Sequence, residues 1–432
     1  MAASVALRRA RKQPTASRIW NIGWKCLCVF SIALLLFGVA GLWAMQFSVG
    51  WAQNAPGEWS DGRAPELEAL VRKRCIPYLR AGKSVGLTVG VVTPTRATLM
   101  AFGRTSVSGS RHVSGDTLFE LGSITKTFTG LALAREIEHG RVRLDQPIQE
   151  LLPPAVELPV DARDVTLQHL VTHTSGFPRL PGNESLVPAF RLLLFGSDPY
   201  AGYTEADLMA AVRTVKLEFN PGARSSYSNF GMTLLGALLS TRAGRSYETL
   251  IKQEVCQPLG MRDTTVTVEN GHIPRMAQGY RALWRSGPLL FGLRSNPWFE
   301  SNHLGGAGAL RSTGADMLKY LQVNMRPEDQ PLEHALRESH RELFNDEKEG
   351  LASGMGWVRM QGQTLKQTII WHNGGTGGFS SYVGFAERSG VGVVVLSNVF
   401  PFANTSGSVD DLSGDLLRDL AALGDQQAPK VN

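Results

Sequence analysis

Segments with the residue pattern of β-strands lie near the two ends of this chain, and no other feature constrains its fold as strongly. β-Branched and aromatic residues with strand-like periodicity occur at residues 85–92, 97–102, 356–360, 368–371, 381–386 and 392–398. Strand signals are sparse in between, where helical spacing occurs at residues 205–215 and 230–242. The distribution predicts a sheet made from both ends of the chain, with a mainly helical region at about residues 147–324 inserted within it.

Helical patterns also flank the predicted strands. Apolar spacing predicts helices at residues 66–79, 123–139 and 409–422, and the last of these closes a predicted domain at residues 66–425. We expect the charged stretch 326–348 to form an exposed helix and a loop. A chain of 432 residues is long enough to bury a large core in one such domain.

The N-terminal residues carry the whole excess of positive charge. The formal net charge is +6, and it equals the contribution of the basic residues that precede the first acidic residue, Glu58, namely Arg8, Arg9, Arg11, Lys12, Arg18 and Lys25. The rest of the chain is close to neutral, so its charge does not favour a nucleic-acid partner.

Residues 26–51 contain no charged side chain and are apolar enough to span a bilayer. Basic residues beside such a span usually stay in the cytoplasm, which assigns residues 1–25 to a cytoplasmic tail. We therefore expect a single-pass membrane anchor, a Gly- and Pro-containing linker at residues 54–65, and a domain outside the cytoplasm. A cleaved signal peptide is the alternative interpretation of the apolar segment.

Cysteine spacing indicates neither a metal centre nor a defined disulfide. Cys26 and Cys28 fall in the apolar segment, so Cys75 and Cys256 are the pair left for an oxidising compartment, and the sequence leaves open whether they are bonded. No C-x-x-C or H-E-x-x-H spacing is present. We predict no metal and no cofactor.

Ser123 and Lys126 lie three positions apart in the segment FELGSITKTFTG. On a helix this spacing places both side chains on one face, so a serine nucleophile and its proton acceptor would be neighbours. The surrounding apolar residues predict that Ser123 opens a buried helix, whose free N–H groups and dipole favour negative charge. A capping serine followed by a solvated lysine is the alternative, because S-x-x-K also arises by chance in a chain of this length.

Two further segments supply candidate partners for this pair. Tyr227-Ser228-Asn229 lies in a Pro-Gly-rich loop before a predicted helix, and nearby cations would favour the anionic form of the tyrosine. A turn tyrosine packed on the core is the alternative. The segment WHNGGTGGFSS, residues 371–381, lies between predicted strands, and its glycines allow the Gly375 N–H to approach a bound carbonyl. The motifs of nucleotide-binding loops are not present, which argues against nucleotide binding.

In this order, FELGSITKTFTG, YSN and HNGG resemble the three motifs of the class C β-lactamases and the related low-molecular-mass penicillin-binding proteins of the DD-peptidase type. The resemblance covers residues 85–398 and is supported by LVTHTSGFPRL at 170–180, QPLGMRDT at 257–264 and GGAGALRST at 305–313. It implies an α/β (α+β) fold in which helices flank an antiparallel sheet, in agreement with the placement of the strands.

The resemblance also implies a role for each motif residue. Ser123 would be the acylated nucleophile, Lys126 its proton partner, and Tyr227 the general base and acid. Asn229 would hold a substrate amide. His372, Asn373 and Gly374 would line the substrate site, and the N–H groups of Ser123 and Gly375 would form the oxyanion hole.

His372 and Asn373 are the main departure from the pattern, because the lactamases usually have Lys and Thr there. A neutral imidazole recognises a substrate carboxylate less strongly than a lysine does. Relatives with His at this position include esterase-like and peptidase-like members.

Two neighbouring motifs have simpler interpretations. His173, in HTSG, suggests a Ser-His-Asp site, but Lys126 and Tyr227 already fill the proton-transfer roles and no G-x-S-x-G elbow is present. We therefore interpret His173 as structural. Residues 305–311 are interpreted as a tight packing loop near the site rather than a catalytic element.

Together these observations predict a serine hydrolase that forms an acyl-enzyme on Ser123. Its expected substrates are β-lactam amides or D-alanyl-D-alanine-type peptides of peptidoglycan. We expect it in the inner membrane with its catalytic domain in the periplasm, or free in the periplasm if the apolar segment is cleaved. The alternatives are a carboxylesterase that uses the same residues, and a membrane-anchored penicillin-binding sensor, for which the N-terminal tail is too short to hold an effector domain.

Overall fold

The computed structural model describes residues 45–48, 57–182, 198, 202–286, 289–295, 297, 305–328, 330–362, 364–401 and 407–427. The predicted tail and most of the predicted membrane span lie outside these residues. Strand β1 (Met45–Ser48) falls within the segment predicted as a span. Within the described ranges, no helix is both long and apolar enough to cross a bilayer.

A nine-stranded sheet lies in the compact unit Gln46–Asn432, and its strand order is β2-β4-β3-β14-β13-β12-β11-β10-β9. All neighbouring strands in it are antiparallel. Its strands are β2 (Glu58–Ser60), β3 (Gly86–Val92), β4 (Ala97–Gly103), β9 (Phe344–Asp346), β10 (Leu351–Ser353), β11 (Val358–Gln361), β12 (Thr368–Gly375), β13 (Ser380–Ala386) and β14 (Val391–Ser397). Because β3 pairs with β14, the two ends of the chain meet in one sheet, and this prediction is confirmed.

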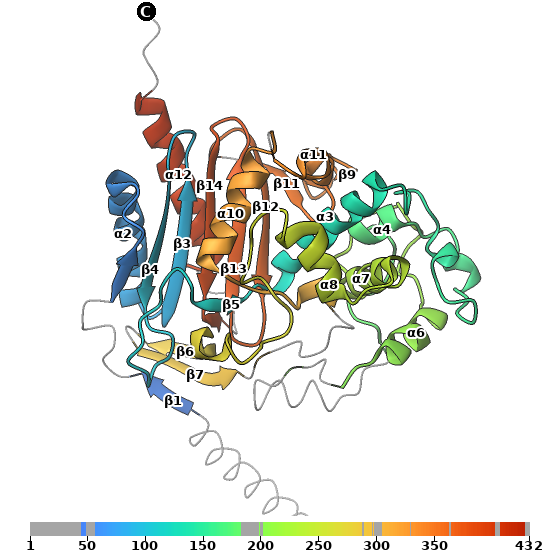
Figure 1. The fold of residues 1–432 in the computed structure, drawn as a ribbon, viewed down its shortest axis with the longest axis horizontal. Coiled ribbons are helices and arrows are strands. Elements are labelled where there is room, and N and C mark those ends of the chain that lie inside the picture. Colours follow the sequence, from blue (N-terminus) through green and yellow to red (C-terminus); the bar gives the residue numbers. More distant parts are fainter. Residues whose placement is uncertain are drawn as a thin grey trace, which may run out of the picture. The chain divides into compact units, whose positions relative to one another are not determined.

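Helices cover both faces of the sheet (Figure 1). Helices α2 (Pro65–Arg80) and α12 (Val409–Gln427) pack on one face, together with Leu87, Val89 and Val91 of β3. Alternate residues of a strand point to opposite faces, so these three side chains enter the same core. On the other face α10 (Gly314–Met325) packs against β3 and β14 and joins the core of the helical part.

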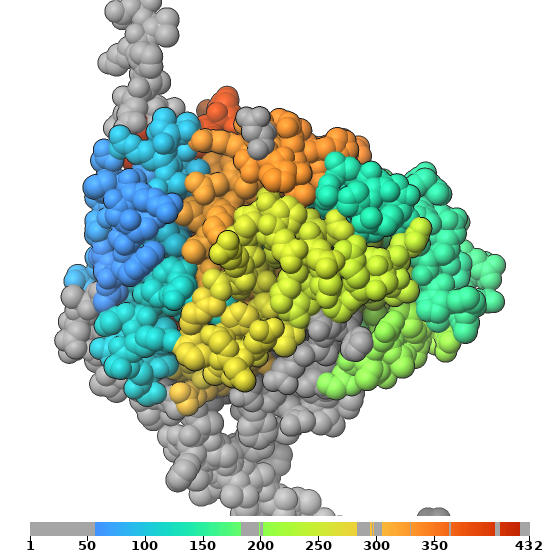
Figure 2. All heavy atoms as spheres, in the orientation of Figure 1, coloured from blue at the N-terminus to red at the C-terminus, as the bar shows by residue number. Residues whose placement is uncertain are grey.

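The other described α-helices lie between residues 125 and 340. They are α3 (Thr125–Glu138), α4 (Leu167–Val171), α6 (Glu205–Arg213), α7 (Asn229–Ala243), α8 (Tyr247–Ile251), α9 (Gly305–Gly308) and α11 (Glu333–His340). Short helical turns are η1 (Gly122–Ile124), η2 (Ile148–Glu150), η3 (Val160–Ala162), the π-helical η4 (Lys252–Cys256) and η5 (Ile273–Arg275). In Figure 2 the yellow-green surface of this part lies directly against the orange surface that includes α10.

The middle of the chain also contains strands that the sequence pattern did not predict. β6 (Gly279–Ser286) pairs with β7 (Leu289–Ser295) and, in parallel, with β15 (Val399–Pro401). The alternation of Tyr280 and Ala282 with Arg281 is a strand signal, but the interspersed arginines obscure it.

Several shorter segments also differ from the predictions. β5 (Leu118–Glu120) pairs with β8 (Arg311–Thr313) directly before the predicted nucleophile. β2 lies in the segment predicted as a linker and pairs with β4. In the charged stretch 326–348 the predicted helix is α11, but β9 replaces the predicted loop and Leu336 of the helix is buried.

Cys75 and Cys256, whose pairing the sequence left open, are both free and buried, so no disulfide joins them. Cys75 belongs to the apolar cluster beneath α2 and α12, whereas Cys256 belongs to the cluster of the helical part. Burial raises the pKa of both thiols, which keeps them protonated and unreactive.

Candidate active site

Ser123 lies in η1, in the turn that joins β5 to α3. The turn passes through Gly122, which has φ +53°, a left-handed conformation that favours glycine. A Cβ at Gly122 would lie 2.7 Å from the Gly375 nitrogen, so only glycine lets this turn approach β12 so closely. Ser123 is therefore presented at the start of α3 against the end of a sheet strand.

Lys126, in the first turn of α3, reaches back to the serine. Its Nζ lies 3.0 Å from Ser123 Oγ and donates to the Ala307 carbonyl at 2.6 Å. The side chain is fully buried, and this burial, with a smaller effect of Arg179, holds the pKa of the Lys126 ammonium well below its usual range. A neutral amine at this place can accept a proton from Ser123.

Tyr227 contacts the same oxygen from the loop before α7. Its hydroxyl donates to Ser123 Oγ at 2.6 Å. Burial raises the pKa of Tyr227 to about 12, and it outweighs the opposing effects of the Ser123 hydrogen bond and of Arg179. The sequence predicted that nearby cations would lower the pKa of Tyr227 and favour its anionic form. This prediction is wrong, because it left out the larger cost of burying a phenolate.

The residues around Tyr227 fix its place. Ser228 caps α7, with its Oγ accepting from Gly231 N at 2.9 Å, and its own N–H donates to His173 Nδ1 at 3.2 Å. The His173 ring lies 4.6 Å from the Tyr227 ring, centroid to centroid. These contacts agree with a structural role for His173. Asn229 opens α7, and its buried Oδ1 has no hydrogen-bond partner among the described residues.

The end of β12 forms the opposite wall. A Cβ at Gly374 would lie 2.0 Å from the Leu121 carbonyl and 3.0 Å from the Ser123 nitrogen, so this strand lies against the serine turn. The ring of His372 lies 6.4 Å from that of Tyr227, and burial, with the Lys126 charge, lowers its pKa to about 3. Asn373 instead donates from Nδ2 to Asp410 Oδ2 at 2.8 Å, toward α12.

A family model described as Beta-lactamase matches residues 71–414. The chain belongs to the β-lactamase family. It is 26% identical over 370 residues to the D-alanyl-D-alanine-carboxypeptidase/endopeptidase AmpH of Escherichia coli (strain K12), with 82% of this chain and 90% of the relative covered. It is 25% identical over 367 residues to a β-lactamase of Pseudomonas fluorescens, covering 78% and 94% of the two chains, and to one of Yersinia enterocolitica, covering 77% and 87%.

Two parts of this β-lactamase-family site were not anticipated from the sequence. Residues 305–311 do more than pack, because the Ala307 carbonyl orients Lys126 and the Leu310 carbonyl accepts from Leu121 N at 2.8 Å. Arg179 lies with its Cζ 5.1 Å from the centroid of the Tyr227 ring. A main-chain carbonyl has no sequence signal. Arg179 lies in the segment LVTHTSGFPRL, but its spacing to the other motifs did not indicate a role.

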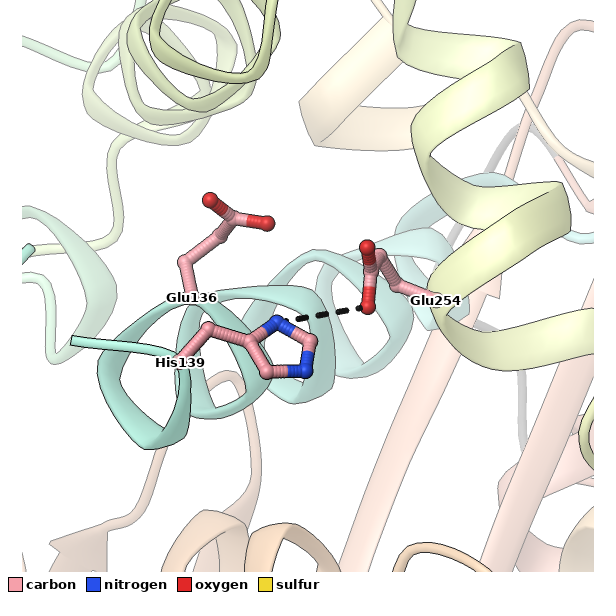
Figure 3. A group of neighbouring side chains, drawn as sticks. All are labelled: Glu136, His139 and Glu254. Carbon is pink, nitrogen blue, oxygen red and sulfur yellow. Dashed lines mark ion pairs between the residues drawn. The ribbon is translucent and has the colours of Figure 1, made fainter. Parts of the chain in front are cut away.

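Among the residues that the structure describes, one group of side chains outside this site consists of residue types that bind metal ions. Glu136 of α3 and His139, which follows the last residue of this helix, face Glu254 of η4, with potential ligand atoms within 4.8 Å of one another (Figure 3). Arg141 donates to both oxygens of Glu136 at 2.6 Å, and Arg245 donates to Glu254 at 2.9 Å. Because arginines already hold these carboxylates, we interpret the group as an ion-pair network that joins α3 to η4 rather than a metal site.

Proposed function

We propose that the protein is a serine hydrolase that works through an acyl-enzyme on Ser123. The observation that carries the proposal is the convergence of Lys126 Nζ and Tyr227 OH on Ser123 Oγ, at 3.0 and 2.6 Å. A nucleophilic serine needs a base within hydrogen-bond reach, and the buried lysine supplies one with a lowered pKa.

In the first step Ser123 Oγ attacks the substrate carbonyl carbon, and its proton passes to the Lys126 amine. The N–H groups of Ser123 and Gly375 hold the negative oxygen that forms, since preorganised donors stabilise such charge. Asn229 Oδ1 accepts an N–H from the acyl part of the substrate, which gives this buried oxygen the donor it lacks among the described residues.

In the second step the bond to the leaving group breaks, and the leaving group takes the proton of Tyr227 OH. A neutral tyrosine with a raised pKa suits this donor role. Tyr227 regains a proton from the Lys126 ammonium, whose nitrogen lies 4.8 Å from the tyrosine ring centroid. Water then attacks the acyl carbon with the same groups acting in reverse, which releases the acid and restores Ser123.

The substrates proposed first are β-lactam amides or D-alanyl-D-alanine-type peptides of peptidoglycan. Support comes from the family and from relatives that are a D-alanyl-D-alanine-carboxypeptidase/endopeptidase and β-lactamases. A second candidate, a carboxylesterase, is favoured by one observation. His372, with a pKa of about 3, is uncharged at neutral pH and offers no cation to a substrate carboxylate.

Rates on a cephalosporin, a D-Ala-D-Ala peptide and a short-chain p-nitrophenyl ester, measured side by side, test the proposal. Ser123→Ala should abolish each activity that the protein has. Unchanged hydrolysis by this variant would show that the mechanism is wrong, and turnover confined to the ester would select the esterase. Mass spectrometry after mixing with penicillin distinguishes a lasting adduct, expected of a sensor, from rapid turnover.

We also propose that the domain lies outside the cytoplasm, held by the apolar residues 26–51 or released after their removal. Alkaline phosphatase fused after residue 427 should be active in intact cells. Sodium carbonate extraction followed by mass determination of the mature chain separates an anchor from a cleaved signal. An inactive fusion made at normal levels would overturn this placement.

A further inference from the structure

Arg179 is held beside the catalytic tyrosine by its own backbone. Its carbonyl accepts from the N–H groups of Asn229 and Phe230 at 3.0 and 3.2 Å, which fixes the residue at the start of α7. Its exposed side chain extends over the Tyr227 ring, with Cζ 5.1 Å from the ring centroid. The guanidinium therefore lies next to Tyr227 and still has donors free to bind another group.

This guanidinium provides the positive charge of the site. Burial lowers the pKa values of Lys126, His173 and His372, so these groups lose their protons more readily than usual. Arginine stays protonated at all ordinary pH values. Among the described residues, the side chain of Arg179 forms no ion pair with a carboxylate. Its charge also contributes to the lowered pKa of Lys126, so the catalytic groups sense it.

The wall opposite Arg179, at the end of β12, presents a neutral side chain to the site. Asn373 points to the other face of β12, where it donates its amide to Asp410 in the first turn of α12. Nδ1 of the neighbouring His372 lies 2.6 Å from the Asn373 carbonyl oxygen. A carbonyl oxygen can only accept, so Nδ1 carries the proton of this neutral ring and donates the hydrogen bond. Within the described part of the chain, this wall thus offers a neutral imidazole and no cation to an incoming substrate.

We propose that Arg179 binds a carboxylate on the acyl part of the substrate. The acyl part is assigned to the arginine because Arg179 adjoins Asn229, the proposed acceptor for the acyl amide. A guanidinium binds a carboxylate through paired hydrogen bonds that an ammonium does not reproduce. The inference rests on the proposed acyl-Ser123 mechanism.

The test compares esters that differ in where they carry a negative charge. kcat/KM is measured for the p-nitrophenyl esters of butyric acid and of succinic acid, and for phenyl acetate and 4-carboxyphenyl acetate. Arg179→Ala should lower the succinate-to-butyrate ratio about 10- to 100-fold, the range for one lost charge-assisted pair. Arg179→Lys should restore part of this loss. The ratio of 4-carboxyphenyl acetate to phenyl acetate should stay unchanged in Arg179→Ala.

Arg224 provides a matched control, because its Cζ lies 4.2 Å over the ring of Phe219 and its side chain is also exposed. Arg224→Ala should leave both ratios unchanged. If Arg179→Ala slows the butyrate and succinate esters equally, the carboxylate site is wrong. If it changes only the leaving-group ratio, the assignment to the acyl part is wrong. If ester hydrolysis persists in Ser123→Ala, the acyl-Ser123 mechanism itself is wrong. Changes in the two substrate ratios test only the carboxylate site, so the two failures can be told apart.

Discussion

Ser381 Oγ donates a hydrogen bond of 2.7 Å to the carbonyl of Leu121, two residues before the proposed nucleophile Ser123. Both partners are buried, and they come from distant parts of the chain, β13 and the turn after β5. Because β13 is a central strand of the sheet, this bond holds the serine turn against a rigid support. The position of Ser123 is therefore set by the sheet as well as by α3.

Ser381→Ala should reduce both stability and activity. The variant leaves the Leu121 carbonyl without this donor, which costs about 1–3 kcal/mol of unfolding free energy. It also loosens the serine turn, so we expect kcat to fall about tenfold or more. Ser380→Ala is the control, because Ser380 Oγ donates to the Val399 carbonyl at 2.8 Å from the same strand. Urea unfolding and kcat measure the effects, and an equal loss of kcat in both variants would show that the bond to Leu121 has no special part in catalysis.

Lys126→Met should remove the proton acceptor while preserving the fold. Methionine has a similar length, and the buried site then loses an amine that is costly to charge. We expect kcat/KM to fall about 10²- to 10⁴-fold, with little change in Tm, because removal of the buried amine offsets the loss of its hydrogen bond to the Ala307 carbonyl. Lys126→Arg should not restore activity, because a guanidinium does not lose its proton. Recovery with arginine would mean that Lys126 acts as a fixed charge rather than as a base.

Gly374→Ala should disrupt the contact between β12 and the serine turn. The new Cβ would lie 2.0 Å from the Leu121 carbonyl oxygen, which is backbone and cannot rotate away. Displacement of reacting groups by about 1 Å costs about 10²-fold in rate, so kcat/KM should fall by at least that factor. Gly271→Ala is the control, because nothing lies within 4 Å of a Cβ there. Normal activity in Gly374→Ala would mean that this close approach is unnecessary.

The pH dependence of ester hydrolysis should report the charge of Arg179. The proposed mechanism requires neutral Lys126, so kcat/KM should rise with pH as this ammonium loses its proton. Burial and the Arg179 charge both lower the pKa of Lys126. Arg179→Ala removes the second effect, so the rising limb should move to higher pH. The rates of an uncharged ester over the pH range in which the protein stays folded measure this shift, and a limb that stays in place would rule out electrostatic coupling between the two residues.

The sheet and the central residues of the site could be predicted because their signals are local. Strand alternation and the spacing of Ser123 and Lys126 depend on neighbouring residues in the sequence. The support from Ala307 is different, because a main-chain carbonyl has no residue signature. The high pKa of Tyr227 depends on burial by distant segments, so a count of nearby cations gave the wrong direction. The β6–β7 pair was missed because arginines interrupt its apolar pattern.

His340 should make stability fall in mild acid. Its Nε2 lies 2.8 Å from Asn324 Oδ1, and burial lowers its pKa to about 3. In the unfolded chain the His340 side chain has its ordinary pKa of about 6.5. Below that pH the unfolded chain therefore binds a proton at His340 that the folded protein excludes. The unfolding free energy should therefore decrease as pH falls from about 6.5 to 3, by up to about 1.4 kcal/mol per pH unit from this residue. Urea unfolding should give a smaller slope in His340→Gln than in the control His334→Gln, an exposed position, and equal slopes would contradict this origin.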